Sequence, residues 1–262
     1  METNYIIEER VIERAMADYP QIPQLVEFST PIVSFGYPTN ARVVTVGINP
    51  SSLEFLTAGK NKKILPAAKK RLVDLEMLGV SNPKALNRET AIKVINGCYS
   101  YFDKTSKPYM TWFKHLNENV NDYFDCDYRN GTAAHLDLVQ WATDPVWGKI
   151  KDYGVREELL QSDADFLRFQ INQKKYEVIF MNGKQVYEQL TDNKIVKAVS
   201  VETVTYLTTS GKTRPVTFYQ GQSQNGSPVL GWSRTFPGHH ISKESLPGVI
   251  EKLHKHFERS IN

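Results

Sequence analysis

The sequence predicts an α/β fold, with a mainly parallel four-stranded sheet flanked by helices and a small β-hairpin insertion. Residues 43–46 are Val-Val-Thr-Val, a β-branched run without polar alternation, which is typical of a strand covered on both faces. Strand-like and helix-like stretches alternate along most of the 262 residues, and this alternation indicates a parallel sheet. Residues 201–220 differ, because two β-rich runs flank Ser210-Gly211-Lys212, as in a hairpin.

Apolar spacing and the positions of proline and glycine locate the individual elements. We expect strands over residues 42–47, 133–141, 176–181 and 229–235. Helices are expected over residues 6–18, 66–78, 88–100, 109–120, 156–172, 184–190 and 242–257. Asp144 before Pro145 has the form of a helix N-cap, and Ser242, with Ser245 as the second choice, should cap the last helix. These elements predict one domain over residues 1–262, with an N-terminal helical extension over about residues 1–40.

Composition indicates a globular protein in a reducing, cytoplasmic setting. No apolar run approaches the roughly 18 residues of a membrane span, and the N-terminus lacks the apolar core of a secretory signal. Cys98 and Cys126 are the only cysteines, too few for a disulfide framework or a four-thiolate cluster. His254 and His256 would not share a helix face, so their spacing does not indicate a metal site. We also expect no cofactor and a monomer.

Basic residues gather in two stretches, although the net charge is only +3. One stretch lies between residues 60 and 71, and the other between residues 239 and 259. Such runs are usually solvated faces, but two of them beside candidate site loops favour a polyanionic partner such as DNA. The residues expected to contact DNA are Lys69, Lys70, Arg71, Ser242 and Lys243.

The first predicted strand leads directly into Gly47-Ile48-Asn49-Pro50. Pro50 holds the backbone of Asn49 near the extended region, which restricts the direction of its amide. Open α/β sheets place their ligands at the carboxyl ends of strands, where Asn49 lies. The simpler interpretation is a strand followed by an ordinary Asn-Pro turn.

Four segments in the same order resemble the uracil-DNA glycosylase superfamily, over roughly residues 40–257. Gly47-Ile48-Asn49-Pro50 matches the first catalytic motif of the mismatch-specific branch and is close to that of the single-strand-selective branch. Residues 134–138 resemble the strand that ends in a base-reading Asn, and residues 158–183 with the following helix resemble the helix–strand–Gly–helix block. Residues 236–240 stand in the place of the second catalytic loop.

The resemblance implies a monofunctional DNA glycosylase that flips a pyrimidine out of the DNA, hydrolyses its N-glycosidic bond and leaves an abasic site. Asn49 would hold the attacking water by its amide oxygen. Gly47, Ile48 and Ser51 would line the base pocket, and Phe102 is a candidate for stacking on the base.

Two positions depart from the superfamily pattern. Phe236 stands where many members have the His that stabilises the departing base, so His239 or His240 takes this role or the role is missing. Alternatively, the two histidines belong to a surface loop. Asp137 replaces the base-reading Asn, unless its carboxylate is tied to the backbone or to His135.

The residues at the pocket bear on which base is excised. A carboxylate at Asp137 accepts from the exocyclic amine of cytosine, but it opposes O4 of uracil. Ser51 replaces a Tyr that blocks groups at C5 in the most specific uracil enzymes. We therefore expect a 5-modified cytosine as the substrate, of the kind found in phage DNA, with a role in antiviral defence. The alternatives are a uracil-DNA glycosylase of base-excision repair and a non-catalytic relative that binds nucleic acid.

Overall fold

The computed structural model describes residues 6–17, 20–104, 110–236 and 241–261. The chain forms two compact units, each built from three segments. The first unit comprises Met1–Pro38, Ile48–Met110 and His135–Leu167, and the second comprises Thr39–Gly47, Thr111–Ala134 and Arg168–Asn262. The chain therefore crosses between the units at the end of β1 (Val43–Gly47) and within β2 (Ala133–Asp137).

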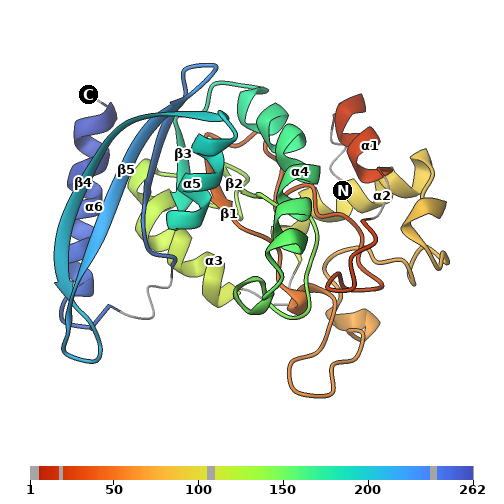
Figure 1. Ribbon diagram of the computed structural model, residues 1–262. Helices are drawn as coiled ribbons and strands as arrows, with labels where there is room; N and C mark the ends of the chain where they lie inside the picture. The colour runs from red at the N-terminus through yellow and green to blue at the C-terminus, as the bar shows by residue number, and fades with distance from the viewer. Residues whose placement is uncertain (1–5, 18–19, 105–109, 237–240, 262) are drawn as a thin grey trace. The chain divides into compact units, whose positions relative to one another are not determined.

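The α/β class is confirmed by an open sheet of six strands with helices against it (Figure 1). The other four strands are β3 (Val178–Asn182), β4 (Val196–Leu207), β5 (Thr213–Ser223) and β6 (Pro228–Trp232), and the order is β2–β1–β3–β6–β5–β4. β1, β3 and β6 pair in parallel, whereas β4, β5 and β6 pair in antiparallel. β1 and β3 are short and buried along their whole length, as their apolar runs predict. β2 is also fully buried, although it contains His135 and Asp137.

The count of four strands is wrong because the predicted hairpin is part of the sheet. β4 and β5 form this hairpin, and β5 also pairs with β6 from Phe218↔Trp232 to Gln222↔Pro228. The first half of β4 is almost entirely exposed. Its sequence therefore lacks the regular apolar positions from which a sheet strand is predicted.

The described helices are α1 (Glu9–Ala15), α2 (Arg88–Tyr99), α3 (Met110–Leu116), α4 (Tyr153–Asn172), α5 (Lys184–Asp192) and α6 (Leu246–Ile261). Residues 66–78 do not form the expected helix and contain only a short 3₁₀ turn, Ala67–Lys69. Asp74 accepts a hydrogen bond from the backbone N–H of Met77, and such side-chain contacts compete with helical bonding. No helix begins at Asp144, whose carboxylate instead contacts Lys62 Nζ at 2.5 Å.

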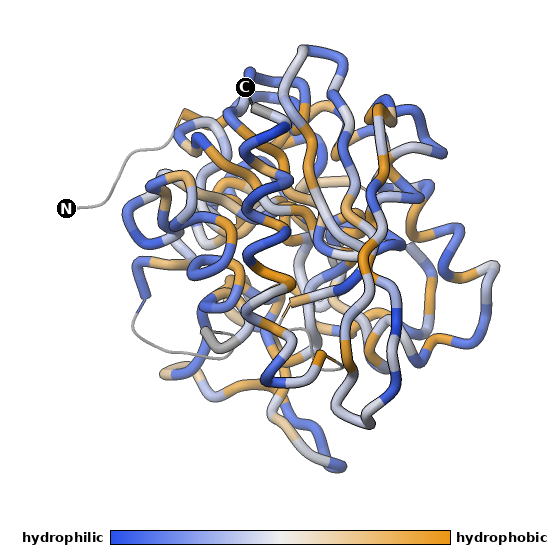
Figure 2. The backbone as a smooth tube through the Cα atoms, turned by 90° about the vertical axis from the view of Figure 1, so that its left-hand side faces the viewer, coloured by the Kyte–Doolittle hydropathy of each residue, from blue (hydrophilic) through white to orange (hydrophobic). Residues whose placement is uncertain are grey.

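Helices α5 and α6 of the second unit cover opposite faces of its sheet. Phe218 and Tyr219 are adjacent on β5, so their side chains point to opposite faces. Tyr219 stacks on Tyr187 of α5 at 4.0 Å, and Phe218 lies against His256 of α6 at 5.7 Å between ring centroids. In Figure 2, hydrophilic and hydrophobic residues alternate along α6. Its buried apolar residues include Val249, Leu253 and Phe257, which recur every four positions on one side of the helix, and His256 beside them is buried as well.

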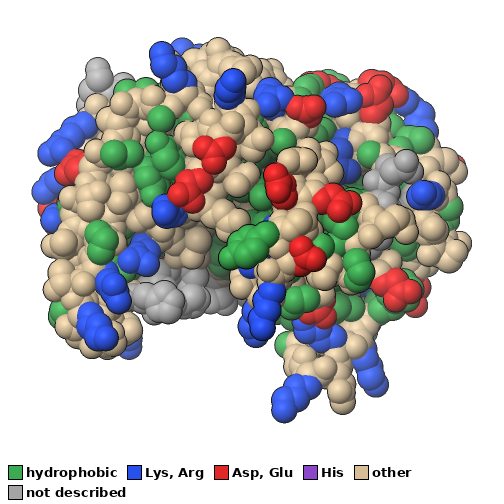
Figure 3. Space-filling view, viewed as in Figure 1, with side chains coloured by type: hydrophobic (Ala, Val, Ile, Leu, Met, Phe, Trp, Pro, Cys, Tyr) green, Lys and Arg blue, Asp and Glu red, His purple; other side chains and the backbone are tan. Residues whose placement is uncertain are grey.

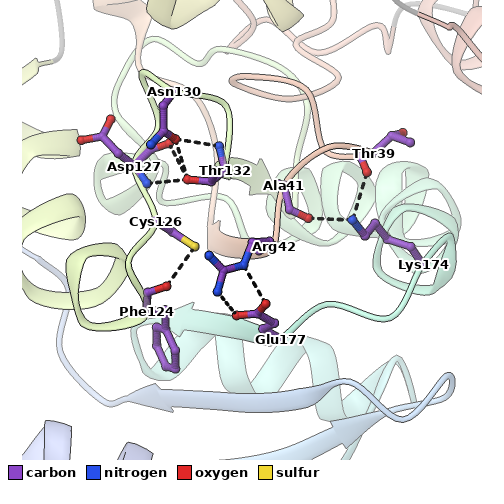
Figure 4. Close-up of polar contacts among 10 residues, drawn as sticks. All are labelled: Thr39, Ala41, Arg42, Phe124, Cys126, Asp127, Asn130, Thr132, Lys174 and Glu177. Atoms are coloured by element: carbon purple, nitrogen blue, oxygen red, sulfur yellow. Dashed lines mark hydrogen bonds and ion pairs between the residues drawn. The ribbon is translucent and has the colours of Figure 1, made fainter.

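Polar contacts hold the amino ends of β1 and β3 together (Figure 4). Arg42 donates to both carboxylate oxygens of Glu177, at 2.6 and 2.8 Å, and Lys174 donates to the carbonyls of Thr39 and Ala41. The Arg42 and Glu177 side chains are nearly half exposed, so the pair adds little stability. The carboxyl end of β1 leads into Ile48 and Asn49.

The N-terminal stretch is part of the core of the first unit. Arg14 of α1 forms a buried ion pair with Asp163 of α4, and Arg14 Nε donates to Gln140 at 2.9 Å. Asp163 also accepts from the backbone N–H of Gln140 at 2.6 Å. Residues 20–38 contribute buried apolar side chains, including Ile32 and Phe35. In the described parts of the chain, no helix is long and apolar enough to cross a membrane.

Candidate active site

The segments that follow β1 and β2 run side by side within the first unit. The backbone N–H of Val139 donates to the carbonyl of Ile48 at 2.9 Å, and Ser51 forms a parallel bridge with Thr143. Asn49 follows the end of β1 by two residues, and Asp137 is the last residue of β2. This arrangement places an amide and a carboxylate on neighbouring segments of one unit, next to the sheet ends.

The amide of Asn49 has one defined orientation. Nδ2 donates to Thr143 Oγ1 at 2.9 Å and to the Pro50 carbonyl at 3.0 Å, and it lies 3.5 Å from the Trp141 carbonyl. Because carbonyl oxygens only accept hydrogen bonds, the nitrogen must face them. Among the described residues no donor contacts Oδ1 of Asn49, and the side chain is half-buried. Oδ1 is therefore the atom that can accept a hydrogen bond from a water molecule.

Asp137 is buried, with 5% of its surface exposed. Its carboxylate lies 3.3 Å from Nε2 of His135, the residue two positions earlier on the same face of β2. The sequence left open whether the Asp137 carboxylate reads a base or is tied to His135, and the structure shows the contact with His135. It does not use both carboxylate oxygens, so it orients the group without excluding a second hydrogen-bonding partner.

Glu54 is a second buried carboxylate, which sequence reasoning missed. Only 2% of Glu54 is exposed, and its two oxygens accept from the Tyr101 hydroxyl at 2.8 and 3.0 Å. The Arg71 guanidinium lies 5.0 Å from the centre of the Tyr101 ring. The pKa of Glu54 is raised to about 7, mainly by burial and in smaller part by the charge of Asp137, against the lowering effects of the Tyr101 hydrogen bond and the Arg71 charge. The available signal was a lone acidic residue between Leu53 and Phe55.

We expect Glu54 to make the stability of the protein depend on pH. The folded pKa of about 7 lies above the ordinary value of 4.5 for Glu, so the contribution of Glu54 to stability is complete below pH 4.5 and is lost as the pH rises towards 7. Glu54→Gln should therefore gain stability relative to the parent between about pH 5 and pH 8, by up to about 3 kcal/mol. Urea unfolding at a series of pH values measures this difference, and a difference that does not change with pH would contradict the assignment.

The other expected base-binding residues occupy mixed environments. Phe102 is buried, with 9% exposed, and its ring meets that of Tyr101 edge to face at 5.1 Å. Gly47 is a buried strand residue, and Ile48 is half-buried. Ser51 caps the 3₁₀ turn Ser52–Glu54, because its hydroxyl accepts from the N–H of Leu53 at 3.2 Å. Phe102 and Ser51 thus have structural partners of their own.

The basic run at residues 69–71 is not one solvated face. Lys69 is exposed, as expected, but the Lys70 side chain is 6% exposed and pairs with Asp74 at 2.7 Å and Glu76 at 2.6 Å. Arg71 is 1% exposed and lies over the Tyr101 ring. Phosphate contacts by Lys70 and Arg71 do not fit this burial, so only Lys69 remains a candidate for DNA binding in this run.

Arg71→Met should lower the free energy of unfolding by about 1–3 kcal/mol, because it removes a buried cation that lies over the Tyr101 ring and lowers the pKa of Glu54. Lys69→Met, the same substitution at an exposed neighbour, should change stability by no more than about 0.5 kcal/mol. Urea unfolding at neutral pH compares the two variants. Equal effects would mean that Arg71 is not part of the buried cluster with Glu54.

The second expected catalytic loop is described only at its ends. Phe236 is buried in the second unit, where its ring packs on Trp232 at 4.4 Å and its N–H donates to Asn182 Oδ1 at 2.9 Å. His239 and His240 lie outside the described residues. Ser242 is 5% exposed and accepts from the N–H of Ser245, which directly precedes α6, so Ser242 is neither the cap nor an exposed phosphate contact. Lys243 is exposed.

Comparison with models of known protein families and with curated proteins finds no match for this chain. Among the described residues, no group of three or more His, Cys, Asp or Glu side chains is placed to hold a metal ion. The site is therefore defined by its own geometry, which combines an oriented amide, two buried carboxylates and a buried arginine.

Proposed function

We propose that the protein is a monofunctional DNA glycosylase that hydrolyses the N-glycosidic bond of a flipped pyrimidine. The observation that carries this proposal is the orientation of Asn49. Three acceptors lie within hydrogen-bonding distance of its amide nitrogen, and within the described part of the chain no donor contacts its oxygen, which supports a role in holding water. An acceptor of this kind can hold a water molecule against C1′ of a deoxyribose.

The reaction needs little basicity from the amide. As the bond between C1′ and the base nitrogen lengthens, the bonding pair moves to the base and the sugar becomes oxocarbenium-like. The water oxygen then bonds to C1′ and its proton passes to solvent or to the departing base. Because the leaving group departs first, orientation of the water contributes more than its deprotonation, and a fixed amide is well suited to this.

We propose a 5-modified cytosine as the base, with Asp137 as its reader. The carboxylate of Asp137 is buried, and its contact with His135 leaves it capacity to accept from an exocyclic amine. Glycosylated or hydroxymethylated cytosines of phage DNA would belong to this substrate class. The proposal then gives the protein a role in antiviral defence, in the cytoplasm.

The test is incubation of the protein with oligonucleotides that each carry one base, followed by alkaline cleavage at abasic sites. The panel contains cytosine, 5-hydroxymethylcytosine, its glucosylated form, uracil and thymine, in single and double strands. Cleavage of the modified cytosines above the cytosine control is the expected result. Cleavage of uracil alone would establish the uracil-DNA glycosylase alternative, and no cleavage of any substrate would reject catalysis on these bases.

A second candidate function is non-catalytic binding of nucleic acid, and the environment of Phe236 favours it. This residue stands where the resembled family has a histidine for the departing base, and it is fully engaged in core packing. Retained DNA binding together with no abasic product on the whole panel would support this second function.

A further inference from the structure

A hollow of about 440 Å³ lies beside the turn of the β4–β5 hairpin in the second unit. Arg214, Arg234 and Tyr206 line it, together with three hydroxyl residues of the turn, Thr208, Thr209 and Ser210. Figure 3 shows Lys and Arg side chains over this end of the hairpin, at the lower left of the view. Among the described residues, no carboxylate lines the hollow or pairs with either arginine.

Arg234 is held in place by contacts that leave much of its guanidinium available. Nη2 donates to the Pro215 carbonyl at 3.1 Å, and the guanidinium carbon lies 5.2 Å from the centre of the Tyr206 ring. Nε is buried and has no acceptor among the described residues. An arginine fixed on one side with unused N–H groups on the other is preorganised for an anion with several oxygens.

Tyr206 supplies a second, independent sign of a missing partner. The residue is 5% exposed, and its buried hydroxyl has no hydrogen bond within the described chain. Buried hydroxyls are normally satisfied, so an unpaired one at the wall of a hollow points to a ligand or to water. Arg214 is the cross-strand partner of Tyr206 on β5 and is exposed, which places a second cation at the same wall.

We propose that this hollow binds a phosphate group, through the guanidinium groups of Arg214 and Arg234 with help from the hydroxyls of Tyr206 and the hairpin turn. Two cations that no carboxylate faces in the described part of the chain favour an anion, and the combination of a guanidinium fork with hydroxyl donors matches phosphate oxygens. The phosphate can belong to a DNA backbone or to a free phosphate or phosphomonoester. That the phosphate belongs to DNA rests on the proposed function, whereas the phosphate site itself does not.

The first arm of the test measures binding of unmodified duplex DNA as a function of salt, so that base excision plays no part. Arg214→Gln should reduce the slope of log K against log[salt] by about one. Lys212→Gln is the matched control, because Lys212 is an exposed cation of the same turn that does not line the hollow. Arg234→Lys keeps the charge but loses the fork, and it should weaken binding at every salt concentration.

The second arm adds inorganic phosphate to the folded protein at constant ionic strength and follows Tm. A rise in Tm for the parent that is lost in Arg214→Gln supports the site. A different outcome is that phosphate raises Tm in this way while the salt dependence of DNA binding is the same in Arg214→Gln and in the parent. In that case the ligand of the hollow is a free phosphate or phosphomonoester and not DNA. The proposal is overturned if phosphate has no effect and Lys212→Gln changes DNA binding as much as Arg214→Gln.

Discussion

Asn49→Ala is expected to lower the rate of base excision by at least about 100-fold while leaving DNA binding nearly unchanged. The alanine removes Oδ1, which accepts no hydrogen bond from the described residues, whereas the amide nitrogen donates to Thr143, Pro50 and Trp141. It removes no charge, so the electrostatic attraction of DNA should be the same. Single-turnover excision and equilibrium binding on the same modified oligonucleotide measure the two quantities separately.

Thr143→Ala is a milder variant that tests the same role of Asn49. It keeps Asn49 but removes its shortest acceptor, at 2.9 Å, so that the amide is less firmly oriented. A smaller loss of rate than in Asn49→Ala is expected, because the two carbonyl contacts remain. An Asn49→Ala loss well under about 100-fold would remove Asn49 from the water-holding role, as would an equal loss in binding.

The sequence could predict the parts of the fold that depend on local pattern. The apolar runs of β1 and β3 and the helical spacing of α2 all indicate elements that are present, within a few residues of their predicted ends. The hairpin was predicted from its turn residues, but its pairing with β6 depends on a partner that no local pattern specifies. The spacing of Leu72 and Leu75 indicated a helix, yet both are buried within turns.

The site shows the same division between local and long-range information. Asn49 follows the end of the predicted strand over residues 42–47, whereas Asp137 lies in the middle of the predicted strand over residues 133–141 and is the last residue of β2. Glu54 could not be assigned, because its environment depends on Tyr101, 47 residues further along the chain. For the same reason, Lys69 and Arg71 look alike in the sequence although one is exposed and the other buried under an aromatic ring. A run of basic residues shows where positive charge lies in the sequence, but tertiary contacts determine which of these side chains are buried.

Asp137→Asn should change which base the protein prefers. The amide places a donor where the carboxylate had only acceptors, so it can pair with O4 of uracil but faces the cytosine amine less favourably. Each misplaced polar contact in a buried site costs about 1–3 kcal/mol, and the preference should therefore move towards uracil by roughly ten- to a hundredfold or more.

The structure adds a control to this experiment, because Asp137 acts electrostatically on Glu54. The charge of Asp137 raises the pKa of Glu54, so Asp137→Asn should lower that pKa and shift any pH dependence that Glu54 imposes. Excision of uracil and of a 5-modified cytosine is therefore measured for the parent, Asp137→Asn and Glu54→Gln at several pH values. A change of preference that persists at every pH belongs to direct reading by Asp137, whereas one that follows the titration of Glu54 does not. Equal loss on both bases, or a parent that already prefers uracil, would remove Asp137 as a cytosine reader.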